Sequence, residues 1–374
     1  MAAGPEHAAT PSIGVMLHDF ALGGSERVAI RLANAWAVAG CNVVLLAGSG
    51  EGPQRKLVRD QVPVEIAAPR VPRAGRDPAQ LGAWFGRRCA ALGLEAAFVP
   101  GNSYFRAVAP ALASAPRLQM LAKVSNPLWR ADRSMWRNLV FAMKTRRRLR
   151  GVLAVVAMSP AMARGARRAL GPAFRIEVIP NPVLDAVPAA ATARRRWHLC
   201  AAGRLVPQKN FSLLLQALSM LKDLPVTLDL LGEGPLEAQL RQQAARLGIQ
   251  DRVNFAGRVD DVHPHLAAAE IAMITSDFEG YPAVAIEAMA AGTFLISVHC
   301  SASIPEIISS PLMGTCVSSR DPAELAAAVR RYFDNRACDR DRMRELAVQH
   351  LTSVSARRYL DILADRNPQE SIRP

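Results

Sequence analysis

The sequence of 374 residues contains no apolar run long enough to cross a bilayer, for which about 18 residues are needed. Its opening stretch, MAAGPEHAATPS, has no basic region followed by an apolar one, so we expect a short leader rather than a secretory signal. Its six cysteines form no CxxC pair and no zinc-type spacing. This pattern favours reduced, buried thiols in a cytoplasmic protein over a disulfide framework or a zinc site.

Acidic residues are in the minority, since 32 Asp and Glu stand against 46 Lys and Arg and give a net charge of +14. Such a surplus favours anionic partners: nucleic acid, an anionic membrane face or a phosphate-bearing substrate. Disorder is excluded, because half of the residues are apolar and 21% are charged. The sequence has no zinc finger and no RNP aromatic pair, so a basic nucleic-acid-binding protein is the most distant alternative.

Strand and helix patterns alternate along the chain. An apolar run at residues 13–17, a helical pattern at 26–38 and an apolar run at 42–47 form a βαβ unit, which predicts a parallel sheet. Further strands are predicted at 97–99, 119–124, 152–158, 175–179, 199–202, 226–231, 253–256, 271–275 and 294–298, and helices at 210–221, 235–247 and 282–291.

The chain is too long for one hydrophobic core, and its composition shifts to Pro, Ala and Arg between residues 180 and 197. We therefore predict an α/β protein with two doubly wound, Rossmann-like domains that face a cleft. The N-terminal domain is expected to cover residues 11–182. A linker of residues 183–196 follows, and the C-terminal domain covers residues 197–350. A C-terminal helix within 351–374 is expected to pack back on the N-terminal domain. Ligands of such sheets bind at the carboxyl ends of the strands.

Two loops at predicted strand ends carry candidate ligand contacts. Gly23 and Gly24 directly precede a helix, where bare backbone lets N–H groups approach a ligand; a tight turn is the alternative. Arg204 and Lys209 follow a later strand. The planar guanidinium of Arg204 and the point charge of the Lys209 ammonium can together bind a diphosphate. The alternative is that both are solvated loop cations.

The strongest pattern spans residues 277–292, after the strand predicted at 271–275. Glu279 lies in a loop, and Gly280, Tyr281 and Pro282 open a helix whose N-terminal N–H groups and dipole suit a phosphate. Glu287 follows about a turn later, where its two oxygens can accept hydrogen bonds from adjacent ribose hydroxyls. An exposed helix carboxylate is the alternative for Glu287, although its neighbours are apolar.

A basic and aromatic segment precedes the middle of the chain. Apolar residues alternate there with cations, which fits an amphipathic helix on an anionic membrane; a solvated helix face on its own domain is the alternative. The basic and Trp residues of this segment are Trp129, Arg130, Arg133, Trp136, Arg137, Lys144, Arg146, Arg147, Arg148 and Arg150.

Taken together, these motifs resemble family 4 of the glycosyltransferases, whose GT-B fold has two Rossmann-like domains. The resemblance runs from about residue 13 to about residue 308, and the order and spacing of its pieces make it specific. The motifs are GGSERV (23–28), VIPNPV (178–183), GRLVPQKNF (203–211), LLGEGP (230–235), RVNFAGRV (252–259) and EGYPAVAIEAMAAG (279–292).

This resemblance implies roles for the candidate residues. Arg204 and Lys209 would hold the donor diphosphate, and the loop of Gly23 and Gly24 would approach the same phosphates. Glu279 would lie by the donor sugar and Glu287 would hold the ribose. Gly280, Tyr281 and Pro282 complete the expected donor contacts.

The family also implies transfer with retention of anomeric configuration, without a metal or a cofactor. We find no metal-binding Asp-x-Asp loop; residues 260–261 and 339–341 look like surface turns. Many relatives carry a His near the donor sugar, where this chain has Ser125 or Asn126, which puts a His-dependent step in doubt.

The expected donor is a nucleotide-diphosphate sugar, with UDP favoured over GDP. The acceptor would be a saccharide or a lipid-linked hydroxyl in bacterial surface polysaccharide or glycolipid synthesis. The expected location is the cytoplasm, at the inner face of its membrane, without nucleic acid as a partner. A nucleotide-sugar epimerase or another GT-B enzyme is the alternative within this fold.

Overall fold

The computed structural model describes residues 11–71, 78–130, 133–190 and 193–365. Most of the expected leader (residues 1–10) and the end of the expected C-terminal segment (366–374) lie outside the described residues. The chain divides into two compact units, one of residues 1–182 with 352–374 and one of residues 183–351. Each contains one parallel sheet, which confirms the predicted α/β class with two Rossmann-like halves.

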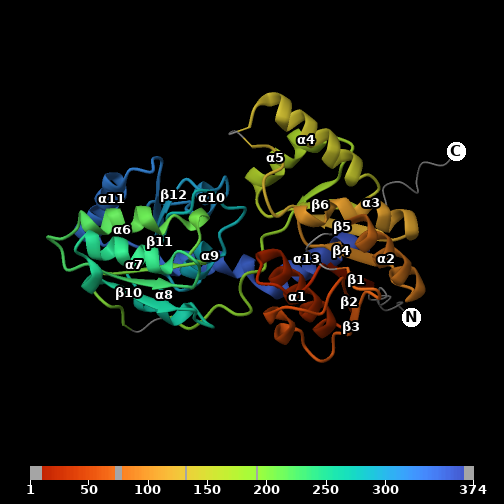
Figure 1. The fold of residues 1–374 in the computed structure, drawn as a ribbon, viewed down its shortest axis with the longest axis horizontal. Coiled ribbons are helices and arrows are strands. Elements are labelled where there is room, and N and C mark those ends of the chain that lie inside the picture. The colour runs from red at the N-terminus through yellow and green to blue at the C-terminus, as the bar shows by residue number, and fades with distance from the viewer. Residues whose placement is uncertain (1–10, 72–77, 131–132, 191–192, 366–374) are drawn as a thin grey trace, which may run out of the picture. The chain divides into compact units, whose positions relative to one another are not determined.

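The first unit has a seven-stranded sheet in the order β3-β2-β1-β4-β5-β6-β7 (Figure 1). The expectations for 13–17 and 42–47 agree with β1 and β2 to within one residue. The sequence patterns did not predict β3, because this strand is short and only half-buried. The strands are β1 (Ser12–Leu17), β2 (Asn42–Ala47), β3 (Val64–Ile66), β4 (Ala96–Val99), β5 (Gln119–Lys123), β6 (Ala154–Ala157) and β7 (Ile176–Val178).

Helices cover both faces of this sheet. Ile13 and Val15 of β1 belong to a core that includes residues of α1 and α13. On the opposite face, a Cβ added to Gly14 would meet Cys89 Sγ of α2 at 2.9 Å. Burial on both faces explains why β1 is almost uniformly apolar. The helices are α1 (Gly24–Val38), α2 (Pro78–Ala91), α3 (Phe105–Ser114), α4 (Met135–Arg148), α5 (Pro160–Leu170) and α13 (Thr352–Ala364).

The last helix, α13, packs against α1 in the first unit. Trp36 of α1 donates from Nε1 to the carbonyl oxygen of Ala356 at 3.0 Å. Its ring meets Phe98 and Tyr359 edge-on, with centroids 5.6 and 5.9 Å away. Three aromatic rings from α1, β4 and α13 therefore join segments that are far apart in sequence.

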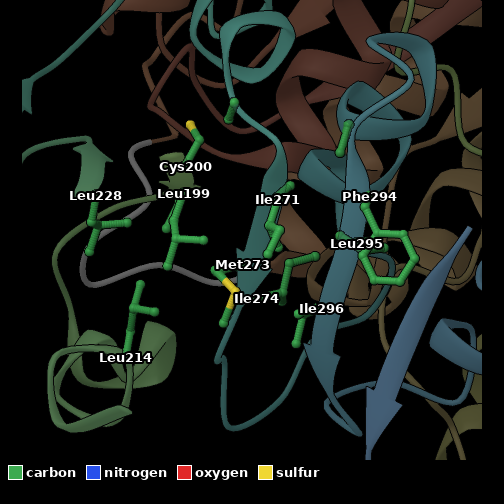
Figure 2. Close-up of a cluster of buried hydrophobic side chains, with 14 of the residues drawn as sticks. Leu199, Cys200, Leu214, Leu228, Ile271, Met273, Ile274, Phe294, Leu295 and Ile296 are labelled. Atoms are coloured by element: carbon green, nitrogen blue, oxygen red, sulfur yellow. The ribbon is translucent and has the colours of Figure 1, made fainter. Parts of the chain in front are cut away.

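The second unit has six strands in the order β10-β9-β8-β11-β12-β13. Figure 2 shows its core, where Leu199 and Cys200 of β8 lie near Ile271, Met273 and apolar residues of β12. The strands are β8 (His198–Ala202), β9 (Thr227–Leu231), β10 (Val253–Gly257), β11 (Ile271–Ile274), β12 (Phe294–Val298) and β13 (Gly314–Val317). The helices are α6 (Phe211–Ser219), α7 (Glu237–Arg246), α8 (His263–Ala268), α9 (Ala283–Ala290), α10 (Ile304–Ile307), α11 (Pro322–Asn335) and α12 (Arg340–Ala347).

The segment predicted as a linker begins inside the second unit. Val183 is buried in its core, and the N–H groups of Val183 and Leu184 donate to the carbonyl oxygen of His350 at 3.0 and 3.1 Å. These contacts pair the chain where it enters the second unit with the residues just before α13.

Truncation of the aromatic cluster tests the attachment of α13. We expect Trp36→Ala to lower the free energy of unfolding of the first unit by about 3–5 kcal/mol, because a fully buried aromatic side chain leaves a cavity. Urea denaturation, monitored by far-UV circular dichroism so that the signal does not depend on tryptophan, measures the change. Val38→Ala on the same helix is the control, since Val38 is 62% exposed and should change stability by less than about 0.5 kcal/mol. Equal effects of both substitutions would contradict the assignment.

Candidate active site

Two loops meet at the carboxyl edge of the second sheet. The loop after β8 and the loop after β11 are joined by Gln208, whose carbonyl oxygen accepts from Asp277 N at 2.8 Å and whose Nε2 donates to Phe278 O at 2.9 Å. Asn210 adds a bond from Nδ2 to Asp277 Oδ1 at 2.9 Å. It also caps α6 in a left-handed conformation (φ 46°), because its Oδ1 accepts from Leu213 N at 3.3 Å.

An ion pair forms where these loops touch. Lys209 Nζ lies 2.6 Å from Glu279 Oε1, and Ser276 Oγ donates to the same oxygen at 2.8 Å. The side chains of Lys209 and Glu279 are only 22% and 12% exposed. Lys209 is therefore held in one place by a charge-assisted hydrogen bond, unlike a solvated loop cation. No hydrogen bond from the described residues reaches the second oxygen of Glu279, Oε2.

Glycines make room for this arrangement. A Cβ added to Gly203 would lie 3.0 Å from Lys209 Cε, so the lysine stem packs directly on bare backbone. Gly232, after β9, has φ +130°, and a Cβ there would be 2.0 Å from the carbonyl oxygen of Gly203. The glycines of the GRL and GEG motifs thus allow two adjacent loops to stack.

Arg204 differs from Lys209 in its surroundings. Its side chain is exposed and forms no hydrogen bond or ion pair with the part of the chain that the structure describes. Arg204 belongs to the same loop as Lys209, and the N–H donors of its guanidinium are available to an anion.

The helix predicted after Gly280 begins one residue later than expected. α9 starts at Ala283, and Pro282 is its N-cap with φ −74° and ψ 103° rather than a residue of the first turn. Gly280 is buried, and its carbonyl oxygen accepts from Ser301 Oγ at 3.0 Å. Glu287 is half-buried within the helix. The N-terminus of α9 thus follows directly on the loop that holds Glu279.

Three arginines bind the other end of α9, which the sequence patterns did not indicate. Arg194 donates to the carbonyl oxygens of Ala291 and Gly292 at 2.6 and 2.9 Å. Arg344 donates to Ala290 O at 2.8 Å, and Arg340 to Gly292 O at 2.7 Å. Burial lowers the pKa of Arg194 to about 10, so it is charged at neutral pH. These cations satisfy carbonyls that have no partner within the helix and complement its dipole.

Tyr281 connects the same loop to the residues before α13. Its hydroxyl lies 3.4 Å from His350 Nε2, and burial raises the pKa of Tyr281. His350 is also the residue whose carbonyl oxygen accepts from Val183 and Leu184. Sequence reasoning missed this contact, because 69 residues separate the two rings.

Gly23 and Gly24 belong to the first unit, which is described by itself. A Cβ at Gly23 would lie 2.2 Å from Glu26 Oε2, so this glycine leaves room for a buried carboxylate. Glu26 Oε1 accepts from the hydroxyl of Tyr104 at 2.9 Å, and His18 stacks on the Tyr104 ring with centroids 4.5 Å apart. A Cβ at Gly24 would meet nothing within 4 Å.

Ser125 and Asn126 lie just after β5, beside the loop after β4. Asn102 Oδ1 accepts from Ser125 N at 2.8 Å, and Asn102 Nδ2 donates to Asn126 O at 2.8 Å. Lys123, at the end of the same strand, is buried, and this burial lowers its pKa to about 7. The carboxyl edge of the first sheet therefore carries its own polar cluster.

Comparison with known proteins assigns both halves of the chain. Residues 22–185 match the family described as Glycosyltransferase Family 4, and residues 196–335 match Glycosyl transferases group 1. The chain belongs to the glycosyltransferases of family 4. This confirms the family that the motifs indicated.

Curated relatives of this family 4 chain are similar over part of their length. The D-inositol 3-phosphate glycosyltransferase of Geodermatophilus obscurus is 35% identical over 175 residues, which cover 43% of this chain and 36% of that protein. The lipopolysaccharide core biosynthesis glycosyltransferase LpsD of Rhizobium meliloti is 32% identical over 195 residues, 50% of this chain and 55% of LpsD. The matches thus span about a third to a half of these relatives.

Solved structures match the family 4 chain over nearly its full length. HepE of Anabaena, solved in complex with UDP-glucose, has a TM-score of 0.75 at 19% identity and covers 93% of this chain and 98% of HepE. This likeness confirms the predicted GT-B fold. No helix within the described residues has both the length and the apolar character needed to span a membrane.

Replacement of Arg194 tests the support of α9. We expect Arg194→Ala to lower the free energy of unfolding of the second unit by about 3 kcal/mol, because buried carbonyls lose charge-assisted hydrogen bonds. Chemical denaturation measures this loss. Arg196→Ala is the matched control, since Arg196 is exposed and its removal should cost less than about 0.5 kcal/mol. An unchanged midpoint for Arg194→Ala would refute the supporting role.

Proposed function

We propose that the protein is a retaining glycosyltransferase that moves a sugar from a nucleotide-diphosphate donor to a hydroxyl acceptor. The observation that carries this proposal is the pairing of Lys209 with Glu279 beside the N-terminus of α9. Departure of a nucleotide diphosphate develops negative charge on phosphate oxygens. A fixed ammonium, the Arg204 guanidinium and oriented helix N–H groups stabilise that charge without reorganisation.

Each residue then has a distinct role. Arg204 and Lys209 hold the diphosphate, together with the backbone of Gly280, Tyr281 and Pro282. Glu279 orients Lys209 through Oε1 and accepts a hydroxyl of the donor sugar at Oε2. Glu287 accepts the ribose hydroxyls. Gly23 and Gly24 of the first unit approach the donor phosphates.

Retention requires that the acceptor attack from the face that the nucleotide leaves. The bond from the anomeric carbon to the diphosphate oxygen breaks, and the acceptor oxygen forms the new bond on the same face. The acceptor proton passes to the departing phosphate oxygen. In the first unit, Ser125 or Asn126 takes the place of the His that many relatives carry, so this position supplies no imidazole. The reaction needs no divalent metal, because cationic groups of the chain stabilise the leaving group.

The similar proteins support particular donor and acceptor classes for this reaction. HepE is solved with UDP and UDP-glucose, which supports a UDP-sugar over a GDP-sugar donor. LpsD and LpsE of Rhizobium meliloti act in lipopolysaccharide core biosynthesis, which supports a saccharide or lipid-linked acceptor of the bacterial surface. We place the enzyme in the cytoplasm, at the anionic inner face of the membrane.

A donor screen tests the reaction itself. Purified protein is given UDP- and GDP-sugars with saccharide acceptors, and the release of nucleotide diphosphate is followed. We expect turnover that persists after EDTA treatment, and a product whose anomeric proton shows the same configuration as the donor by NMR. Inversion, or activity restored only by Mg²⁺ or Mn²⁺, would contradict the mechanism. Turnover of the donor sugar without any acceptor would favour an epimerase.

Substitutions separate the two glutamates and the lysine. Lys209→Ala and Arg204→Ala should each lower kcat/KM by about a hundredfold, which corresponds to about 3 kcal/mol of transition-state stabilisation. Glu287→Gln should chiefly raise the donor KM, because ribose is bound alike in ground and transition states. Glu279→Gln should chiefly lower kcat.

A double-mutant cycle of Lys209→Ala and Glu279→Gln shows whether Glu279 acts only through Lys209. If Glu279 also contacts the sugar, the double variant is slower than Lys209→Ala alone. If the two are equally slow, Glu279 only positions the lysine. Glu345→Gln on α12, an exposed carboxylate, is the control. A Lys209→Ala enzyme with full turnover would refute the assignment.

A further inference from the structure

Apolar side chains face outward along α4. Five of the twelve large exposed hydrophobic residues of the described chain lie on this one helix. Trp136 is 78% exposed and Met143 is 59% exposed. The five residues recur at spacings of three and four, which places them on one side of the helix. Single exposed apolar residues are ordinary, but a continuous stripe marks a contact surface. The stripe consists of Met135, Trp136, Leu139, Val140 and Met143.

The opposite side of α4, which packs on the first unit, contains polar residues. Asn138 is buried and exchanges hydrogen bonds with the backbone of Arg130 at 2.8 and 3.1 Å. Thr145 is buried and donates to Phe141 O at 2.8 Å. A helix of a water-soluble domain normally buries its apolar face and exposes its polar one. α4 therefore has the outer apolar face expected of a helix that meets a second apolar phase.

Cations border the stripe without internal partners. Residues 133–150 contain no Asp or Glu. Four exposed cations around the helix have side chains with no hydrogen bond or ion pair to any described residue. Their charges are consequently available to an external anionic surface. These are Arg137, Lys144, Arg147 and Arg150.

Other residues of the basic segment are occupied within the first unit. Trp129 precedes α4 and is stacked under the Arg168 guanidinium at 4.1 Å. Arg146 Nε donates to the carbonyl oxygen of Ala169 at 2.8 Å. Arg148 is half-buried, and burial lowers its pKa. The contact surface is thus narrower than the predicted segment 129–150 and centres on the outer face of α4.

We propose that α4 lies in the headgroup region of an anionic lipid membrane, with Trp136, Leu139 and Met143 inserted among the lipids. The four bordering cations then meet lipid phosphates. Nucleic acid would engage the cations but leave the apolar stripe in water. A second copy would set like charges against one another. This inference rests on the proposed function only in that it brings the enzyme to a lipid-linked acceptor.

Vesicle co-sedimentation tests the surface. The full chain should bind vesicles of phosphatidylcholine with phosphatidylglycerol, bind phosphatidylcholine alone much less, and release as salt is raised. Two double variants test the two parts of the surface: Trp136→Ser with Met143→Ser, and Lys144→Gln with Arg147→Gln. Each should lower the partition coefficient about tenfold or more, because inserted side chains and cations near the surface contribute separately.

Met220→Ser with Arg246→Gln is the matched control, because it removes an exposed apolar residue and an exposed cation from the second unit. It should bind vesicles like the unchanged protein. Equal loss in this control, equal binding to neutral vesicles, or no binding to anionic ones would overturn the inference. So would binding of RNA that only the charge variant weakens, or dimerisation that the α4 variants abolish.

Transferase activity with a water-soluble acceptor distinguishes this inference from the proposed function. The α4 variants change no residue of the candidate active site and should retain full turnover in solution. Vesicle binding without any transferase activity would remove the proposed function and leave the surface. Turnover without vesicle binding would do the reverse. Unchanged urea midpoints establish that the variants are folded.

Discussion

Parallel strand pairing is the constraint on which both candidate regions depend. Because neighbouring strands run in the same direction, the chain must return by a crossover each time, and the loops that follow the strands gather at one edge. In the second unit this brings Lys209, after β8, to Glu279, after β11, across 70 residues of sequence. In the first unit it brings Asn102, after β4, to Ser125, after β5. The chemistry at each edge follows from strand order.

Helix α9 transmits this constraint to the rest of the second unit. Its N-terminus follows Glu279 and Pro282, while its last carbonyls are held by arginines from both ends of the unit's sequence. Arg194 comes from the segment with which this unit begins, and Tyr281 touches His350 just before α13. The N-terminus of α9, which we propose binds phosphate, is thus positioned by residues that lie outside the proposed phosphate contact.

The charge surplus is used in three different ways. Arg194 satisfies helix carbonyls in a buried site, and Arg168 stacks on Trp129. Arg147 and its exposed neighbours on α4 remain open to solvent beside an apolar stripe. The net charge of +14 is therefore not spread as a uniform coat of cations. Only the environment of each guanidinium shows which of these purposes it serves.

The sequence by itself determined the alternation of strands and helices and the loops that carry candidate ligands. Apolar runs located β1 and β2 closely, since a strand buried on both faces is apolar throughout. Short, half-buried β3 left no such signal. Tertiary structure alone decided that Lys209 pairs with Glu279, that Arg194 holds α9, and that the stripe of α4 faces outward. Local sequence sets backbone preference, but contacts across many residues arise only when strand order and helix packing bring side chains together.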